Sequence, residues 1–473
     1  MRQNLGSIAR RKMAFARTRF DGWRPLRGLL VRLQHPSVIV VGSFAAVVLA
    51  GTAVLMTPWA SREGTATGFE NALFTATSAV CVTGLIVLDT ASYWSGLGIV
   101  VIGALIQIGG FGIMALVSVV VLLLAHRFGL RMQLSAQMET KSLSIGEVRR
   151  VVQGVFLVSV SVEAVLALVL VLRLALHHGY SWPRALEYGV FHAVSAFNNA
   201  GFALYTDSLV RFESDPWILV PVALAVIAGG LGFPVWFELW RHARHSGRRQ
   251  WSLHFKITAG TTVLLLAAGT ALITLLEWRN PATLGTYTTA GKLLNGFFHG
   301  VMPRTAGFNS LDVGEMRPST LLVTDVLMFI GGGSAGTAGG IKVTTFALVG
   351  FVLWAIVRGE PSVHVMGRRL DTGAQQQALA VALLSIGGVM VCTLILLSTT
   401  RFSLDQVLFE TVSAFGTVGL STGITAELPT LGHLLITLLM FVGRLGPITL
   451  ATALALRTTG RRYELPEERP IVG

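Results

Sequence analysis

Charged residues and cysteines are scarce in this chain of 473 residues. Only 13% of the residues are charged, against about 25% in a typical globular protein, and 52% are hydrophobic. The two cysteines, Cys81 and Cys392, each lie inside an apolar segment, which excludes a disulfide framework and a zinc site with four cysteine ligands. This composition predicts an integral membrane protein.

Motifs of the common enzyme classes are also missing. The sequence has no HExxH, no GxSxG and no paired carboxylates in its apolar runs, and its GxGxxG-like spacings lie inside an apolar run. We therefore expect no enzyme activity, no catalytic residue and no cofactor bound by this chain. His192 and His299 lie within a repeated pattern, described below, and are expected to be structural.

The net charge of +13 does not indicate a nucleic-acid partner, because the basic residues gather in short segments between apolar runs. Such clusters are typical of cytoplasmic loops in membrane proteins. They lie at 10–27, 149–150, 241–249, 358–369 and 457–462. The first apolar run follows a basic arm and has no small-residue cleavage site, so it is expected to span the bilayer with both chain termini in the cytoplasm.

Long apolar runs alternate with shorter, less apolar segments. Eight runs are expected to be membrane-spanning helices, near 37–57, 94–125, 151–176, 216–240, 255–277, 319–356, 376–398 and 432–456. Four shorter segments lie near 69–84, 185–201, 291–307 and 403–419. They are too short to cross a bilayer, which needs about 20 residues, and are expected to be re-entrant.

These short segments form a fourfold internal repeat. They read FTATSAVCVTG, FHAVSAFNNAG, FFHGVMPRTAG and FETVSAFGTVG, with the final glycines, Gly84, Gly201, Gly307 and Gly419, recurring at intervals of roughly 110 residues. An even number of spans between copies makes all four copies parallel, unlike the inverted repeats of many secondary transporters. Four parallel copies around an axis predict a pore.

The end of each short segment is the candidate ion site. A dehydrated cation needs oxygen ligands, and backbone carbonyls from four loops supply them, with glycine allowing the close approach. The candidate filter residues are Val82, Thr83, Gly84, Asn199, Ala200, Gly201, Thr305, Ala306, Gly307, Thr417, Val418 and Gly419. Asp89, Asp207 and Asp312 follow three of these glycines, either to concentrate cations or as ordinary solvated acids.

A glycine-rich segment interrupts the sixth apolar run. Six of its ten residues are glycine, each costing about 1 kcal/mol in a helix relative to alanine, so a mobile insertion is favoured over a helix-packing surface. We call residues 331–340 the glycine-rich loop. The family resemblance described below implies a gate here, and the candidate gate residues are Gly331, Gly332, Gly333, Ser334, Ala335, Gly336, Thr337, Ala338, Gly339, Gly340, Lys342 and Arg444.

Arg444 belongs to this candidate gate because of a second repeat. It takes the place of Gly110 and Gly230 in the sequences IGGFG, AGGLG and VGRLG, so it is expected to face the central path. A snorkelling arginine, or one paired with Glu163, is the alternative.

These loops and the glycine-rich break resemble the Ktr/Trk/HKT superfamily of K⁺ transporters over nearly the whole chain. The resemblance implies an all-α membrane fold with four linked repeats of outer helix, pore loop and inner helix. The expected parts are a basic arm at 1–36, repeats at 37–125, 149–243, 253–357 and 374–456, and a tail at 457–473. The short arm favours a Ktr-type subunit over Trk-type members, which carry two additional N-terminal helices.

The resemblance also implies function and partners. We expect a homodimer in the bacterial inner membrane, taking up K⁺ and controlled by a cytosolic ring of RCK-type subunits that binds a nucleotide such as ATP, ADP or NAD(H). K⁺ would be the transported ion, held by filter carbonyls only. A Na⁺- or H⁺-coupled symporter and a Na⁺-permeable cation transporter are the alternatives.

Overall fold

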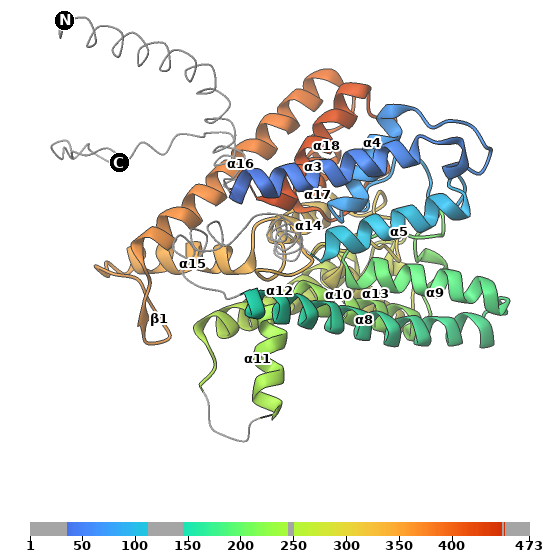
Figure 1. Ribbon diagram of the computed structural model, residues 1–473. Helices are drawn as coiled ribbons and strands as arrows, with labels where there is room; N and C mark the ends of the chain where they lie inside the picture. Colours follow the sequence, from blue (N-terminus) through green and yellow to red (C-terminus); the bar gives the residue numbers. More distant parts are fainter. Residues whose placement is uncertain (1–35, 112–144, 245–249, 447–448, 450–473) are drawn as a thin grey trace, which may run out of the picture.

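The computed structural model describes residues 36–111, 145–244, 250–446 and 449. Long helices recur four times in it, and each is followed by a short helix and then by a third helix (Figure 1). The triplets are α3 (Pro36–Leu55), α4 (Phe69–Val80) and α5 (Gly96–Gly110); α8 (Ile145–Leu176), α9 (Trp182–Phe197) and α10 (Pro216–Gly230); α12 (Leu253–Glu277), α13 (Thr289–Val301) and α14 (Pro318–Phe329); and α16 (Thr372–Thr399), α17 (Leu404–Gly416) and α18 (Thr430–Leu445).

The other elements connect or extend these triplets. They are α11 (Phe233–Arg244), α15 (Val343–Val357), the hairpin β1 (His364–Val365) and β2 (Arg368–Arg369), and the single turns η2 (Pro58–Ala60), η3 (Val210–Phe212), η4 (Leu284–Thr286) and η5 (Thr425–Glu427). Helix α11 and the hairpin project from the helical bundle (Figure 1).

The first helix of each triplet is long and apolar enough to cross a membrane. The qualifying stretches are Val38–Leu55, Val152–Leu176, Leu253–Glu277 and Thr372–Thr399. Each has 18 to 28 residues, and a hydrocarbon core about 30 Å thick needs about 20. Large apolar side chains on these helices are exposed, including Leu264 (66%) and Leu383 (70%), which suits contact with lipid.

The four triplets contact one another in a closed order. Within each triplet the first helix packs against the second and the third. Between triplets the third helix contacts the short helix of the next one: α5 with α9, α10 with α13, α14 with α17, and α18 with α4. The last contact joins residues 363 positions apart, since Glu70 and His433 share a 2.6 Å hydrogen bond. The short helices therefore surround a common centre.

Two of the expected apolar spans are not continuous helices. The run at 216–240 bends by 97° between α10 and α11, where Gly232 has a φ of +91° and Pro234 follows. The run at 319–356 is interrupted between α14 and α15, because the glycine-rich loop is a poor helix former.

Some expected segments are described only in part. The runs at 94–125 and 432–456 are described as far as Phe111 and Gly446, with Thr449 beyond, and the rest of each lies outside the described residues. The same holds for residues 1–35 of the expected basic arm and for the whole expected tail, 457–473.

Candidate functional site

Each short helix is followed by a turn with the same backbone conformation in all four copies. The turns comprise residues 82–84, 199–201, 305–307 and 417–419. The first residue of each has a left-handed φ although it is not glycine: Val82 (58°), Asn199 (61°), Thr305 (89°) and Thr417 (51°). The third residue is a glycine with positive φ: Gly84 (93°), Gly201 (70°), Gly307 (67°) and Gly419 (92°). A left-handed non-glycine residue costs about 1–3 kcal/mol, so the surrounding structure must hold these turns.

The four glycines form a closed ring. A Cβ atom placed on Gly84 would collide with the carbonyl oxygen of Ala200 in the next turn. The same collision recurs from Gly201 to Ala306, from Gly307 to Val418, and from Gly419 back to Thr83. All four separations are under 3.0 Å, which real Cβ atoms essentially never show. Only glycine fits at these four positions, because the carbonyl oxygen of the middle residue of each turn lies beside the glycine of the preceding turn.

Serine hydroxyl groups hold three of the four turns. Ser78 Oγ accepts a hydrogen bond from the Gly84 amide at 3.0 Å, and Ser413 Oγ accepts one from the Gly419 amide at 3.1 Å. In the second copy, Ser195 Oγ donates to the carbonyl oxygen of Phe202 at 2.8 Å. The third copy has Val301 at the matching position, so its turn is held by other contacts.

The two ends of the glycine-rich loop are joined by backbone hydrogen bonds. The Gly331 amide donates to the carbonyl oxygen of Ile341 at 2.8 Å, and the Ile341 amide donates to that of Phe329 at 3.3 Å. Ile330 and Ile341 also form a parallel bridge. We call Ile330, Gly331 and Ile341 the neck of the loop, because they close it where it leaves α14 and approaches α15.

The middle of the loop is attached to the break after α10. The Gly333 amide donates a hydrogen bond to the carbonyl oxygen of Gly230 at 2.7 Å, and the Thr337 amide donates one to the carbonyl oxygen of Gly229 at 3.3 Å. In return, the Phe233 amide donates to Ala335 at 3.3 Å. The two discontinuities of the fold, in the second and third triplets, therefore support each other.

The loop lies directly against the ring. Thr337 Oγ1 is 3.2 Å from the side-chain amide of Asn199, and that amide is 3.0 Å from Thr305 Oγ1. A Cβ atom on Gly339 would collide with the side chain of Thr417. The loop therefore contacts the opening residues of two turns and reaches a third through Asn199.

A buried arginine and a partly buried lysine donate hydrogen bonds to carbonyl oxygens of this loop. Arg444 is only 4% exposed. Its Nη1 donates to the carbonyl oxygen of Thr337, and its Nη2 donates to the carbonyl oxygen of Gly109 at the end of α5. Lys342 Nζ donates to the carbonyl oxygen of Ala338 at 2.6 Å. Arg444 neither snorkels to solvent nor pairs with Glu163. Glu163 instead accepts hydrogen bonds from Gln107 and Asn198, both at 3.1 Å.

Acids after the ring have local partners. Asp207 forms a 2.7 Å ion pair with Arg211, and Asp89 accepts hydrogen bonds from Ser92 and Thr206. Asp312 accepts a hydrogen bond from the backbone amide of Gly314 in its own turn. The contact between Asp89 and Thr206 joins the first two copies, whereas Asp207 and Asp312 have partners within their own segments.

The buried histidines support the chain that follows the ring. His299 Nε2 accepts from the amides of Ser310 and Leu311 at 3.3 and 3.2 Å, and His192 Nε2 accepts from the Leu204 amide at 3.3 Å. Both therefore have structural contacts.

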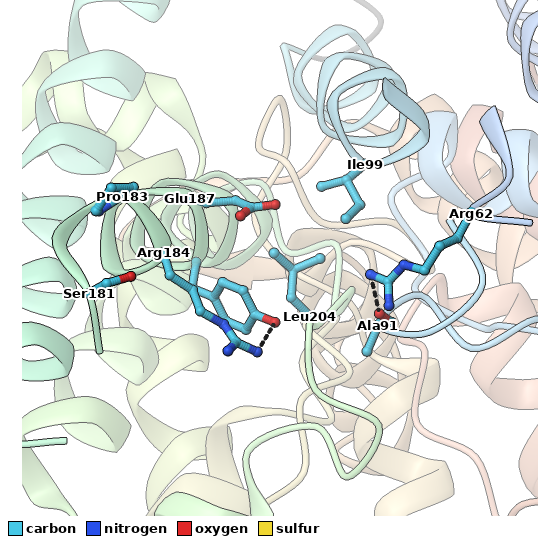
Figure 2. A pocket seen from close by; sticks show the side chains of 9 residues that line it. Arg62, Ala91, Ile99, Ser181, Pro183, Arg184, Glu187 and Leu204 are labelled. Atoms are coloured by element: carbon cyan, nitrogen blue, oxygen red, sulfur yellow. Dashed lines mark hydrogen bonds between the residues drawn. The ribbon is translucent and has the colours of Figure 1, made fainter. Parts of the chain in front are cut away.

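A separate hollow of about 440 Å³ lies between α5 and the start of α9 (Figure 2). Arg62, Arg184 and Glu187 line it, and each arginine has a local partner: Arg62 donates to Ala91 at 3.1 Å and Arg184 to Tyr188 at 3.5 Å. Its lining contains no residue of the four turns or the glycine-rich loop. The part of the chain that the structure describes has no His, Cys, Asp and Glu group suited to a metal ion.

Comparisons with known proteins agree over almost the whole chain. A family model described as TrkH, cation transport protein, matches residues 18–461. The chain is 40% identical over 443 residues to the Ktr system potassium uptake protein B of Bacillus subtilis (strain 168), which covers 94% of this chain and 98% of that protein. This chain belongs to the TrkH family of cation transport proteins.

Other relatives of the TrkH family extend this result. The chain is 39% identical over 439 residues to the Ktr system potassium uptake protein B of Vibrio alginolyticus (93% of this chain, 95% of the relative). It is 35% identical over 448 residues to the potassium/sodium uptake protein NtpJ of Enterococcus hirae (93% and 97%). The crystal structure of the potassium transporter TrkH from Vibrio parahaemolyticus has the same fold, with a TM-score of 0.71 at 18% identity over 90% of this chain and 86% of that one.

One buried residue of this TrkH-family chain was missed by the sequence analysis. Arg304 lies in the third short segment, three residues before Gly307, and is only 6% exposed. It donates to the carbonyl oxygens of Thr262 at 3.1 Å and Gly331 at 3.2 Å. The available signal was a single arginine within FFHGVMPRTAG, at the position of Cys81, Asn198 and Gly416 in the other copies.

Proposed function

We propose that this chain is the pore-forming subunit of a Ktr-type K⁺ uptake system in the bacterial inner membrane. The observation that carries the proposal is the closed ring of Gly84, Gly201, Gly307 and Gly419. Four turns of one conformation, each presenting a carbonyl oxygen beside the glycine of the preceding turn, suit a dehydrated cation without burying a fixed negative charge. The relatives named for potassium uptake support K⁺ as the transported ion.

The four triplets act as four pore repeats around this ring. Their closed contact order, from α5 with α9 to α18 with α4, supports a central path bounded by all four. Each short helix ends at the ring, so its partial negative carboxyl end lies close to the ion. The twelve turn residues are the selectivity filter in this proposal, and no other cofactor is needed in this chain.

The glycine-rich loop closes the path on the inner side of the filter. Thr337 and Gly339 lie against the opening residues of two turns, where they obstruct an ion that has passed the ring. Arg444 adds a positive charge beside the loop and holds it through Thr337. Opening requires the loop to leave these contacts.

Control of the loop is assigned to partner subunits. The relatives are parts of a Ktr system, which supports a cytosolic RCK-type ring carrying the nucleotide and a homodimer of this chain above it. Both chain termini face the cytoplasm in this arrangement, following the basic clusters in the sequence.

A coupled symporter or a Na⁺-permeable transporter is the second candidate. It is favoured by the relative named for potassium and sodium uptake. The two candidates differ in whether flux depends on a second ion. A channel-like pore passes K⁺ alone down its gradient, whereas a symporter moves Na⁺ or H⁺ together with each K⁺.

The test is growth and flux with one filter variant. A bacterium without K⁺ uptake systems expresses the chain or Gly419→Ser at limiting K⁺, with and without a cognate regulatory subunit, and the purified protein is assayed in proteoliposomes. We expect wild type to restore growth and to pass K⁺ without co-transport of Na⁺ or protons, and the variant to lose K⁺ uptake or admit Na⁺. K⁺ flux that moves Na⁺ or protons with it in fixed proportion would favour the symporter. Absence of K⁺ flux in wild type at normal abundance would refute the proposal.

A further inference from the structure

Arg304 occupies an unusual place between the filter and the glycine-rich loop. The residue immediately after it, Thr305, opens the third turn of the ring, while its guanidinium group reaches the first residue of the loop. One nitrogen donates to Gly331 and another to Thr262 on α12, so a single side chain connects the ring, the loop and the surrounding helix.

The contact is made at the neck and not at the middle of the loop. Gly331 uses its amide to donate to Ile341 and its carbonyl oxygen to accept from Arg304. Its Cα is also confined, because a Cβ atom there would collide with the carbonyl oxygen of Gly339. Gly331 is therefore held on three sides, whereas Ala335 at the far side of the loop is exposed.

Arg304 is charged and buried, and it forms no ion pair with a carboxylate of the residues that the structure describes. A buried guanidinium group loses much hydration, so its retention requires strong acceptors. Both of its acceptors are backbone carbonyl oxygens, Thr262 on α12 and Gly331 at the neck. The matching residue of the second copy, Asn198, donates its side-chain hydrogen bonds to Gln107, Glu163 and the carbonyl oxygen of Val194.

We infer that Arg304 is a positioning residue that anchors the neck, so that the glycine-rich loop moves about a fixed point while its middle detaches. This inference rests on the proposed function of the loop as a gate. It separates the two arginines by role: Arg444 holds Thr337 in the middle of the loop and must release it, whereas Arg304 holds Gly331 throughout. Loss of the anchor lets the whole loop drift from the ring, and the path then stays open more often.

The flux test uses the full chain at matched membrane abundance. Arg304→Gln removes the charge and most donors, whereas Arg304→Lys keeps the charge on a single donor nitrogen. Thr262→Ala is the matched control, because it removes a methyl group and a buried hydroxyl that has no hydrogen-bond partner and leaves the carbonyl oxygen that Arg304 binds. We expect Arg304→Gln to raise the maximal K⁺ uptake rate several-fold at unchanged KM and unchanged K⁺ over Na⁺ preference. Arg304→Lys should be intermediate and Thr262→Ala unchanged.

A changed KM or new Na⁺ uptake at an unchanged maximal rate would overturn the inference, because Arg304 would then support the filter. An unchanged rate in Arg304→Gln, with KM also unchanged, would overturn it as well.

A second readout does not depend on transport. Ser334→Cys introduces a thiol of similar size into the half-buried part of the loop, and the native thiols Cys81 and Cys392 are buried. We expect Arg304→Lys to raise the rate at which an impermeant thiol reagent modifies Cys at position 334 in inside-out vesicles, several-fold over the arginine-containing chain. An unchanged labelling rate would reject the anchor. If wild type passes no K⁺, the proposed function fails while this labelling result still decides the role of Arg304.

Discussion

At the scale of single residues, the ring glycines differ from nearby glycines in their surroundings and not in their backbone angles. Gly419 and Gly423 have φ values of +92° and +97°. A Cβ atom on Gly419 would collide with Thr83, whereas one on Gly423 meets nothing within 4 Å. We expect Gly419→Ala to abolish selective K⁺ uptake. Gly423→Ala should cost only backbone strain, about 1–3 kcal/mol, and keep uptake. Initial K⁺ and Na⁺ uptake rates, corrected for membrane abundance, make the comparison.

The pair of variants separates two causes. Equal loss of uptake in both would show that a positive φ alone forbids a side chain here, and the closed ring would lose its functional meaning.

Arg444 carries a second prediction at the residue scale. Arg444→Gln leaves the carbonyl oxygens of Thr337 and Gly109 without their guanidinium donor and removes the positive charge beside the loop. We expect faster K⁺ uptake at an unchanged KM, because the loop is released while the filter keeps its geometry. Kinetics of K⁺ uptake without the regulatory subunit provide the measurement, with Arg444→Lys retaining the charge as the comparison. Slower uptake at full abundance would mean that Arg444 serves the open path.

At the scale of elements, the glycine-rich loop depends on glycine where it meets the ring. A Cβ atom on Gly339 would collide with Thr417, whereas Gly350 in the neighbouring α15 has open space around it. We expect Gly339→Ala to prevent the loop from seating and to raise the basal K⁺ flux. Gly350→Ala should leave the flux unchanged and stabilise α15 by up to about 1 kcal/mol. Tracer flux into proteoliposomes lacking the regulatory subunit compares the two.

If Gly339→Ala lowers the flux as far as a filter variant does, the loop would belong to the conducting structure and not to its closure.

The helices and turns differ in how well the sequence alone predicts them. The short segments and their final glycines recur as a local pattern, so the family, the short helices and the candidate turns were accessible from the sequence. The 97° bend after α10 was not, because an apolar run reads the same whether or not its two halves are collinear. The partners of Arg304 and Arg444 were also inaccessible, since Arg444 and Gly109 are 335 positions apart. Such contacts are decided by how the triplets close on each other.

At the scale of the whole molecule, the proposed pore requires all four short helices to enter the membrane from one side. The turns that precede them contain the exposed residues Glu63, His177, Thr286 and Arg401, whereas Arg244 and Met366 lie in segments that follow a third helix or α15. Cys81 and Cys392 are buried, so a single introduced cysteine reports its own side of the membrane.

Single-cysteine labelling tests this arrangement against an inverted repeat. We expect an impermeant thiol reagent added to intact cells to label cysteine at 63, 177, 286 and 401, but at 244 and 366 only after permeabilisation. An inverted repeat would split the first four positions into two accessible and two protected sites, and the ring could then not be formed by four parallel copies. Every triplet contributes one turn to the ring. If one of the four positions were protected, the turn of its triplet would not reach the common centre, and the ion would lose one quarter of its proposed ligands. A carbonyl filter shared by four loops would then have to be abandoned.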